Sequence, residues 1–584
     1  MIIKPCDWTV DYYLNNEENC NKSLEELDKL QEIPSLNYES LDNFRDGQLV
    51  RFQGMLQDMY NPEYYFKKYE VIDTKTGERS SKCGMYIDSA RCKPHERVSI
   101  DSSNNESSER QTWIVISTPG LNDWAKGNQP LTKRIRTCGR EPSTSDCNKR
   151  GLNQTDEQMD CSEPVKKKDK KITDNNTNDA SVLQLNESTP MIVSKDYLLN
   201  FPIPNENGKA CIVKVYKEYP QKLNQIIDIV GFLSLDPNLG ETVDSDEMLS
   251  DLERQTHHPP ASIVPRLHAI KIVNEISEYS DNSGIISMAE GIRGDLRMIL
   301  SQLLFGDEIA ADYLICHLIS SVYLRKDYLC LGNFSLNITN IPKEYENFTK
   351  DFYEILKQII AKSHFLNITL ETLNEMNFVP KKDYDCNRLT TGILQLSDNT
   401  HLIIDETNLT TGQLTVCGRQ NYGAMTDLTK FQKLAYDFKF YNMNYETDIP
   451  VLILSDVKSF IPCETQIMLK PDPDSINMYP RILEAATQYL KDEGRLNNIR
   501  QYVNTLKKVK FEISDETTNI IQDDFVKLRQ NDEKFSADNL HLLMVLSRLM
   551  SLSYGFKTLT PEMWKRSLEM EMERKNRLLK RNRN

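Results

Sequence analysis

The chain has 584 residues, of which 39% are apolar and 27% charged, and its formal net charge is −15. This length predicts two or three domains, and the negative charge argues against a surface covered by nucleic acid, because phosphate binding requires a basic face. No apolar run is long enough to cross a bilayer or to form the core of a signal peptide, so we expect a soluble, intracellular protein. The 13 cysteines include no C-x-x-C pair and the eight histidines are dispersed, so the sequence predicts no metal site and no cofactor.

The first 40 residues are expected to form a helical segment with a short amphipathic helix at 24–31. A β-rich domain follows in two parts, residues 41–121 and 192–240. Its predicted strands lie at 49–59, 111–116, 210–216 and 226–235. Gly54 lies within the first strand and indicates a bulge or a tight bend. Together these strands predict one five-stranded barrel of the OB (oligonucleotide/oligosaccharide-binding) type.

Residues 122–191 separate the two parts of this domain. They are rich in Ser, Thr, Asn, Asp and Lys and have no regular apolar spacing, which predicts a disordered insertion. The insertion contains a lysine run made of Lys166, Lys167, Lys168, Lys170 and Lys171. On an accessible segment this run is either a solvated charge cluster or a nuclear import signal, and the sequence leaves both open.

An acidic and proline-rich connector, residues 241–284, leads to a predicted α/β domain at 285–510. Its strands are runs rich in leucine and β-branched residues at 334–338, 365–370, 401–404 and 450–454. With helical stretches between some of them, they predict a mainly parallel sheet covered on both faces. Residues 511–584 are expected to be helical, with Ser536 and Thr560 as N-caps and the last twenty residues as a basic, fraying tail.

The strand predicted at 401–404 ends in two acidic residues, Asp405 and Glu406. In a P-loop ATPase the first such carboxylate lies over Mg²⁺ and the second polarises water. That chemistry also requires a G-x-x-x-x-G-K-[ST] loop, whose backbone amides and lysine hold the phosphates, and the chain has none. The loop after the first predicted strand, residues 339–343, lacks glycine and the K-[ST] pair, and Lys343 is interpreted as a surface lysine.

Five sequence blocks point to a known family. They are VRFQGMLQDMYNPEYY (50–65), LNFPIPNENGKACIVKVY (199–216), PPASIVPRLH (259–268), AADYLICHLISSVYLRKD (310–327) and NRLTTGILQLSDNTHLIIDET (387–407). With these blocks the chain closely resembles the mini-chromosome maintenance (MCM) complex-binding protein family. The resemblance implies a nuclear protein that binds subunits of the heterohexameric MCM helicase, promotes their assembly or protects them, and helps remove the complex from chromatin late in S phase.

A second resemblance concerns the MCM ATPase core itself. GILQLSDNTHLIIDET (392–407) is similar to the piece of that core that carries the paired carboxylates, and SADNL (536–540) is similar to the start of its helical lid. Asp538 stands where the lid would place a nucleotide-sensing arginine, so an anion replaces a cation. The resemblance implies a degenerate AAA+/MCM-like α/β domain with a helical lid, in which Asp405 and Glu406 remain as the end of a core strand.

We therefore expect a non-enzymatic partner of MCM subunits that meets chromatin only through them and binds neither a membrane nor a specific DNA sequence. One alternative is a residual ATPase using Asp405 and Glu406, which would lack most of the required charge stabilisation. The other is a binder of single-stranded nucleic acid through the barrel. Its stacking residues would be Tyr60, Tyr64, Tyr65 and Phe66, with Lys67 and Lys68 nearby, although Asp58 and Glu63 dilute that positive charge.

Overall fold

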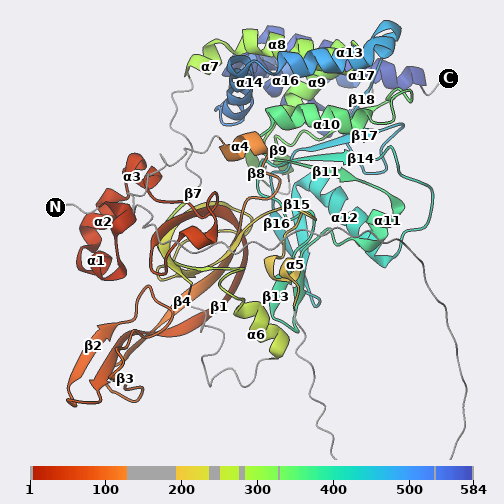
Figure 1. The fold of residues 1–584 in the computed structure, drawn as a ribbon. Coiled ribbons are helices and arrows are strands. Elements are labelled where there is room, and N and C mark those ends of the chain that lie inside the picture. The colour runs from red at the N-terminus through yellow and green to blue at the C-terminus, as the bar shows by residue number, and fades with distance from the viewer. Residues whose placement is uncertain are drawn as a thin grey trace, which may run out of the picture. The chain divides into compact units, whose positions relative to one another are not determined.

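The computed structural model of the protein describes residues 4–127, 193–235, 250–274, 283–326, 329–531 and 535–581. Its described part is a mixed α/β structure in which residues before 133 and after 192 belong to one unit (Figure 1). The lysine run at 166–171 lies outside the described residues. None of the described helices has the length and apolar character needed to cross a membrane.

Five strands close into a barrel in the N-terminal half. They are β1 (Leu49–Asp73), β4 (Glu106–Ile116), β5 (Ala210–Val215), β6 (Ile226–Ser234) and β7 (Arg266–Asn274). β1 pairs with β4 and β4 with β5 in antiparallel fashion, β5 pairs with β7 in parallel, and β6 pairs antiparallel with both β7 and β1, which closes the ring. The prediction that strands on both sides of the 122–191 segment share one sheet is confirmed by the β4–β5 pair.

The barrel differs from the sequence prediction in two places. Its fifth strand, β7, comes from residues that had been assigned to the 241–284 connector. The register of β1 with β4 shifts at three places, between Leu56 and Asp58, between Tyr60 and Glu63 and between Phe66 and Lys68, and none of these is at Gly54. A Cβ atom at Gly54 would lie 2.3 Å from the carbonyl oxygen of Ile116, so the glycine instead allows β4 to approach closely.

Short helices and a ribbon cover and extend the barrel. The helices α1 (Val10–Asn15), α2 (Glu17–Ser23) and α3 (Leu27–Gln31) precede it. The helix predicted at 24–31 is therefore shorter than expected, because Leu24 is the C-cap of α2. Trp8 and Tyr13 pack with Phe232 of β6 in an apolar cluster. Beyond the barrel β1 continues and pairs with β2 (Arg79–Cys83) and β3 (Glu96–Val98).

The C-terminal half is built on a five-stranded sheet. In spatial order its strands are β11 (Ser363–Asn367), β14 (His401–Asp405), β17 (Val451–Ser455), β10 (Leu336–Thr339) and β18 (Thr465–Met468), and all neighbours are parallel. Ile403 packs into one apolar cluster, whereas Leu402 and Ile404 pack into another. Since successive residues of a strand point to opposite faces, both faces of this sheet are covered, which confirms the prediction.

Helices provide the covering layers and most of the C-terminal end (Figure 1). In sequence order, the helices that come before the first strand of the sheet are α8 (Ala289–Leu303) and α9 (Glu308–Leu318). The connections between its strands contain α10 (Phe348–Ile359), α11 (Leu370–Glu375) and α12 (Val416–Phe431). The helices that follow its last strand are α13 (Pro473–Tyr489), α14 (Glu493–Leu506), α15 (Asp515–Asn531), α16 (Ala537–Ser553) and α17 (Pro561–Arg581). Ser536 and Thr560 cap α16 and α17 as predicted.

The expectation of a fraying C-terminal tail is wrong up to Arg581. The guanidinium groups of Arg574 and Arg577 donate to the backbone oxygens of Gln466 (2.9 Å) and Met468 (3.2 Å) on β18. These bonds hold α17 against the last strand of the sheet.

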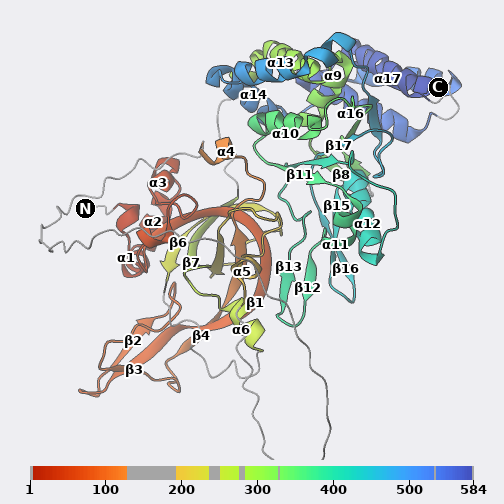
Figure 2. The same cartoon turned by 45° about the vertical axis from the view of Figure 1, so that its right-hand side comes forward.

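Two hairpins form a separate four-stranded sheet that the sequence analysis did not predict. The strands are β12 (Lys381–Asp383), β13 (Arg388–Thr390), β15 (Lys433–Asp437) and β16 (Asn442–Glu446), in the order β13-β12-β15-β16. Figure 2 shows both hairpins projecting from the region of the parallel sheet.

The first residues of the expected insertion are also ordered, contrary to the prediction. Asn122 is buried, and its amide nitrogen donates to the Ile360 carbonyl at 2.7 Å and to the Ser363 hydroxyl at 3.0 Å. The indole of Trp124, in α4 (Asp123–Gly127), donates to the carbonyl of Lys357. The start of the segment is therefore fixed to α10 and β11.

Candidate functional site

The carboxyl ends of the parallel strands are the place where an open α/β sheet binds ligands, at the point where the strand order reverses. Here that point is β10, which lies between β17 and β18. Asp405 ends β14 and Glu406 follows it, and their exposed fractions are 1% and 7%. The structure thus places both predicted carboxylates at this edge, where their partners decide what they can do.

Asp405 accepts three hydrogen bonds from side chains and backbone of the same chain. Its Oδ2 accepts a hydrogen bond from the Thr349 hydroxyl at 2.8 Å. Its Oδ1 accepts from the Thr407 amide at 3.0 Å and from the Thr407 hydroxyl at 2.7 Å. The carboxylate therefore joins the first turn of α10 to the turn that follows β14.

Glu406 holds a different loop. Its Oε1 accepts from the Ser459 hydroxyl (2.9 Å) and the Ile461 amide (3.2 Å), and its Oε2 accepts from the Phe460 amide (2.9 Å). Burial raises the pKa of Glu406, and these donors partly offset that effect. The sequence left open whether these carboxylates cap turns or face a partner, and the structure shows that both cap turns.

The loop after β10 has the position that a phosphate-binding loop would take. A G-x-x-x-x-G-K-[ST] run ending at Thr349 would require glycine at 342 and 347 and lysine at 348, where the chain has Pro342, Asn347 and Phe348. The Phe348 ring is 1% exposed and lies 5.2 Å from Phe305, 5.5 Å from Phe352 and 5.6 Å from Tyr479, measured between ring centroids. Aromatic packing thus fills the position that the cation would hold.

The other two predicted positions lie on the surface. Lys343 has a side chain that is 85% exposed, and its ammonium is 3.8 Å from the carboxylate of Asp456. Asp538 is exposed in the first turn of α16. After burial, which is the larger cause, the charge of Asp538 helps to raise the pKa of Glu464. The contacts of Asp405 and Glu406 described above include neither residue.

Thr349, one of the two residues that donate to Asp405, was not predicted from the sequence. The phosphate-loop comparison covered residues 339–343, whereas the loop continues to Asn347 and α10 begins at Phe348. A comparison of the phosphate-loop motif with the run that ends at Thr349, the second residue of α10, would have identified this threonine.

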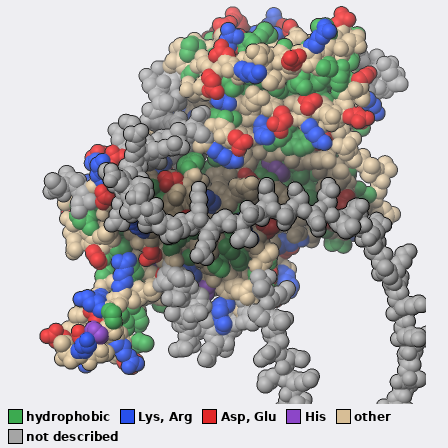
Figure 3. Space-filling model, viewed as in Figure 1, with side chains coloured by type: hydrophobic (Ala, Val, Ile, Leu, Met, Phe, Trp, Pro, Cys, Tyr) green, Lys and Arg blue, Asp and Glu red, His purple; other side chains and the backbone are tan. Residues whose placement is uncertain are grey.

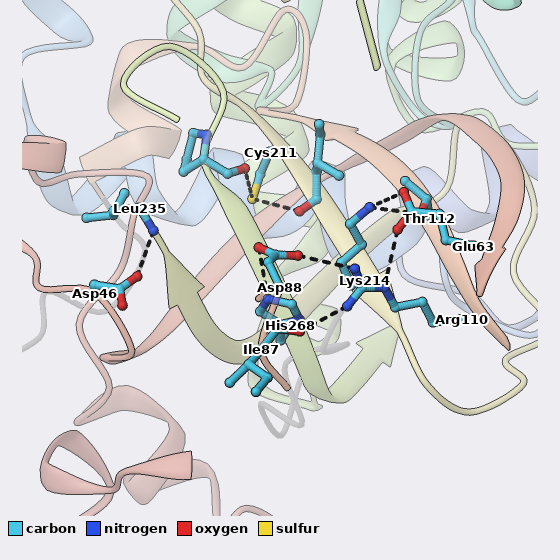
Figure 4. Close-up of polar contacts among 12 residues, drawn as sticks. Asp46, Glu63, Ile87, Asp88, Arg110, Thr112, Cys211, Lys214, Leu235 and His268 are labelled. Carbon is cyan, nitrogen blue, oxygen red and sulfur yellow. Dashed lines mark hydrogen bonds and ion pairs between the residues drawn. The ribbon is translucent and has the colours of Figure 1, made fainter. Parts of the chain in front are cut away.

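The barrel contains a second set of polar groups that are buried or partly buried. Figure 4 shows Glu63, Asp88, Arg110, Thr112, Lys214 and His268. Tyr216 also belongs to the set. Lys214 pairs with Glu63, and Arg110 pairs with Glu63 at 3.2 Å and with Asp88 at 3.3 Å. Nε2 of His268 lies 3.2 Å from Asp88, and its Nδ1 lies 2.7 Å from the Tyr216 hydroxyl.

The charges in this set compensate one another. Burial alone would raise the pKa of Asp88, but His268 and Arg110 hold it well below its usual range. Burial lowers the pKa of Lys214 to about 8. Two carboxylates and two cations are thus paired, and these pairs connect Asp88 to β4 and Glu63 of β1 to β4 and β5. The sequence offered no signal for them, because these residues are far apart in the chain.

The four aromatic residues considered for base stacking are not presented together. Tyr64 is 78% exposed and Phe66 37%, whereas the ring of Tyr65 packs 5.2 Å from Tyr216 and that of Tyr60 lies 4.2 Å from His257. Lys67 and Lys68 follow Phe66 on β1 and are exposed, whereas Arg110 and Lys214 on the neighbouring strands are buried in ion pairs. Among the described residues no cluster of three or more His, Cys, Asp or Glu side chains is placed to hold a metal ion.

The fold and this edge of the sheet define a class of protein: a barrel joined to a parallel α/β structure whose strand-end carboxylates are internal hydrogen-bond acceptors. Comparison with known proteins assigns the family. Residues 20–578 match the model of the family described as mini-chromosome maintenance replisome factor, and the chain belongs to that family. Its relatives include the mini-chromosome maintenance complex-binding proteins of Drosophila melanogaster, Gallus gallus and Homo sapiens.

These similarities extend over nearly the whole chain. The Drosophila protein is 36% identical over 95% of this chain and 94% of its own length. The corresponding values are 35%, 98% and 94% for the Gallus protein and 34%, 96% and 93% for the human protein.

Proposed function

We propose that this protein is a non-enzymatic binding partner of MCM helicase subunits. The names of its relatives support the partner, since each is a mini-chromosome maintenance complex-binding protein. The absence of enzymatic activity is inferred from one observation: donors of the same chain form hydrogen bonds to the carboxylates of Asp405 and Glu406. Residues that must bind Mg²⁺ and activate water need free acceptor positions, and here internal hydrogen bonds already take three of the roughly four acceptor positions of each carboxylate.

We further propose that the barrel, residues 41–121 and 192–240 together with β7, is of the OB type. The single parallel pair, β5–β7, in an otherwise antiparallel ring supports this assignment. Residues 285–510 are proposed as a degenerate AAA+/MCM-like domain and 511–584 as its helical lid. Two features support these assignments. In the parallel sheet the strand that comes first in the sequence, β10, lies between the fourth, β17, and the fifth, β18. The two carboxylates, Asp405 and Glu406, lie at the end of the third strand, β14.

In this proposal the protein takes the place of a ring subunit. An ATPase-shaped domain that lost nucleotide chemistry can keep the faces that pair with neighbouring subunits. Bound to free MCM subunits, it would protect their exposed faces and promote their assembly; bound to a finished ring, it would open the ring and help remove it from chromatin late in S phase. We expect it to act in the nucleus and to contact chromatin only through its partners.

Crosslinking with recombinant MCM subunits, read by mass spectrometry, tests this occupancy. We expect crosslinks from residues 285–584 to the faces through which MCM subunits contact each other. Crosslinks confined to other MCM surfaces would refute the occupancy, and an absence of binding would refute the partner.

The ATPase alternative is tested by titration calorimetry with Mg-ATP, for which we expect no saturable heat. The nucleic-acid alternative has one supporting observation, the exposure of Tyr64 and Phe66. Over the face shown in Figure 3, however, lysine and arginine side chains are interspersed with acidic ones. We therefore expect no salt-dependent shift of labelled single-stranded DNA at low salt.

A further inference from the structure

Asn207 is the only asparagine of the chain that is followed by glycine. It lies in the loop that leads into β5. An Asn-Gly pair is chemically labile, because the backbone nitrogen of the second residue can attack the side-chain amide of the first, and glycine has no side chain to shield that nitrogen. In a folded chain the reaction depends on how firmly the two groups are held.

Neither group is held by a hydrogen bond here. The side chain of Asn207 is exposed, and residues 206–209 belong to neither a helix nor a strand. In the described part of the chain the Asn207 carboxamide and the Gly208 amide have no hydrogen-bond partner. The next amide, that of Lys209, does have one, the hydroxyl of Ser117 at 3.0 Å. The nitrogen of Gly208 is therefore free to approach Cγ of Asn207.

The Asp46–Gly47 pair offers a comparison within the same chain, because it could form the same ring. There both groups are held. The Gly47 amide donates to the carbonyl of Leu233 at 2.7 Å. A carboxylate oxygen of Asp46 accepts from the Leu235 amide at 2.9 Å, as Figure 4 shows. Ring closure at Asp46 must therefore first break two hydrogen bonds, whereas ring closure at Asn207 breaks none.

We propose that Asn207 is a site of spontaneous deamidation. The Gly208 nitrogen gives up its proton to solvent and bonds to Cγ of Asn207, the bond from Cγ to the side-chain nitrogen breaks, and ammonia leaves. The cyclic imide that results takes up a water molecule at either of its carbonyl carbons. Ring opening yields aspartate or isoaspartate, in which the backbone runs through the former side chain. The side-chain amide and water thus become a carboxylate and ammonium, and the reaction requires neither an oxidant nor an enzyme.

The loop around Asn207 connects the barrel to the parallel sheet. The carboxylate of Glu206 accepts a hydrogen bond from the Gly120 amide at 3.1 Å, and the Gly120 carbonyl accepts one from the amide of Ser363 on β11 at 2.8 Å. Deamidation adds a negative charge beside Glu206, whose pKa is already raised by burial, and isoaspartate lengthens the backbone by one methylene group. Deamidation of Asn207 therefore loosens the contact with Gly120 and, through it, with β11.

The test incubates the full chain at mildly alkaline pH, with and without urea, and maps its peptides by mass spectrometry. Deamidation raises the mass of a peptide by about 1 Da, because OH replaces NH₂. Methylation by a carboxyl methyltransferase that is specific for isoaspartate identifies the isomer. Asn207→Gln is the matched control, since it keeps an exposed amide that closes a larger ring more slowly. Far-UV circular dichroism verifies that both proteins are folded without urea.

In the folded wild type we expect the mass increase in the peptide that contains Asn207, at a rate comparable to that in urea, and none at this position in Asn207→Gln. Isoaspartate should form at Asp46 in urea, and at least roughly tenfold more slowly in the folded chain. Deamidation of Asn207 only in urea would overturn the proposal. Equal isoaspartate formation at Asp46 with and without urea would refute the protective role of the hydrogen bonds.

Hydrogen exchange measures the consequence for the fold. After incubation, the amides of Gly120 and Ser363 should exchange roughly threefold faster or more in the deamidated wild type than in Asn207→Gln treated in the same way. Unchanged exchange at both amides in a fully deamidated sample would refute the loosening of the contact.

Discussion

Replacing Phe348 with alanine tests whether the aromatic group beside the strand ends is a structural core. The side chain is 1% exposed and packs against Phe305, Phe352 and Tyr479. Removing a fully buried phenylalanine ring costs about 3–5 kcal/mol, which includes the transfer of the ring and the cavity left behind. We expect Phe348→Ala to lower the free energy of unfolding of this part of the chain by that amount.

Urea unfolding followed by far-UV circular dichroism measures the loss, with Phe440→Ala as the control. Phe440 is 78% exposed, so its removal should change stability by no more than about 0.5 kcal/mol. Mg-ATP titrated calorimetrically into wild type and Phe348→Ala should give no saturable heat, since removing the ring supplies neither glycines nor a lysine. A cost below about 1 kcal/mol, or ATP binding by either protein, would refute the view that packing has replaced phosphate binding here.

Four further changes test the polar contacts. Thr349→Val leaves the buried Asp405 without one donor and should cost about 1–3 kcal/mol in the same urea assay; a neutral result would show that the 2.8 Å bond is dispensable. Glu406→Gln turns an amide toward the N–H of Phe460 and should also destabilise by about 1–3 kcal/mol, whereas a glutamate free to activate water would tolerate the change. Burial raises the pKa of Glu63, but Lys214 and Arg110 lower it from 4.5 to about 2, so ionised Glu63 stabilises the fold above about pH 4.5 and this contribution is lost as the pH falls toward 2. Acid unfolding should accordingly be less steep in Glu63→Gln, and identical acid curves would contradict the pairing. Asn122→Ala removes three buried hydrogen bonds and should speed amide exchange at Ser363, while unchanged exchange would show that this contact does not protect β11.

Local patterns in the sequence predicted the parallel sheet well. Runs such as Leu402–Ile404 must be buried on both faces, and this requirement is visible without knowledge of the neighbours. Capping by Ser536 and Thr560 is also a local property, because donor and acceptor lie three residues apart. The existence and type of these elements therefore followed from short stretches of chain.

Contacts between distant segments were not accessible in this way. The Thr349–Asp405 bond joins residues 56 positions apart, and nothing near Asp405 names its donor. Lys214 alternates with apolar neighbours in β5 and so resembles an outward residue of a half-buried strand, although it is paired inside the protein. The hairpins β12–β13 and β15–β16 were missed because their three- to five-residue strands carry mixed polar and apolar side chains.

The path of the chain between β4 and β5 leaves both flanks of residues 128–192 attached to the C-terminal half. The indole of Trp124 donates to the carbonyl of Lys357, and after residue 192 the backbone oxygen of Tyr197, in α5 (Lys195–Leu199), accepts a bond from Arg388. A cut anywhere between Gly127 and Val193 would give one fragment with β1 and β4 and another with β5, β6 and β7. The barrel would then be a complex of two polypeptides, so a nicked molecule should migrate as one species until it is denatured.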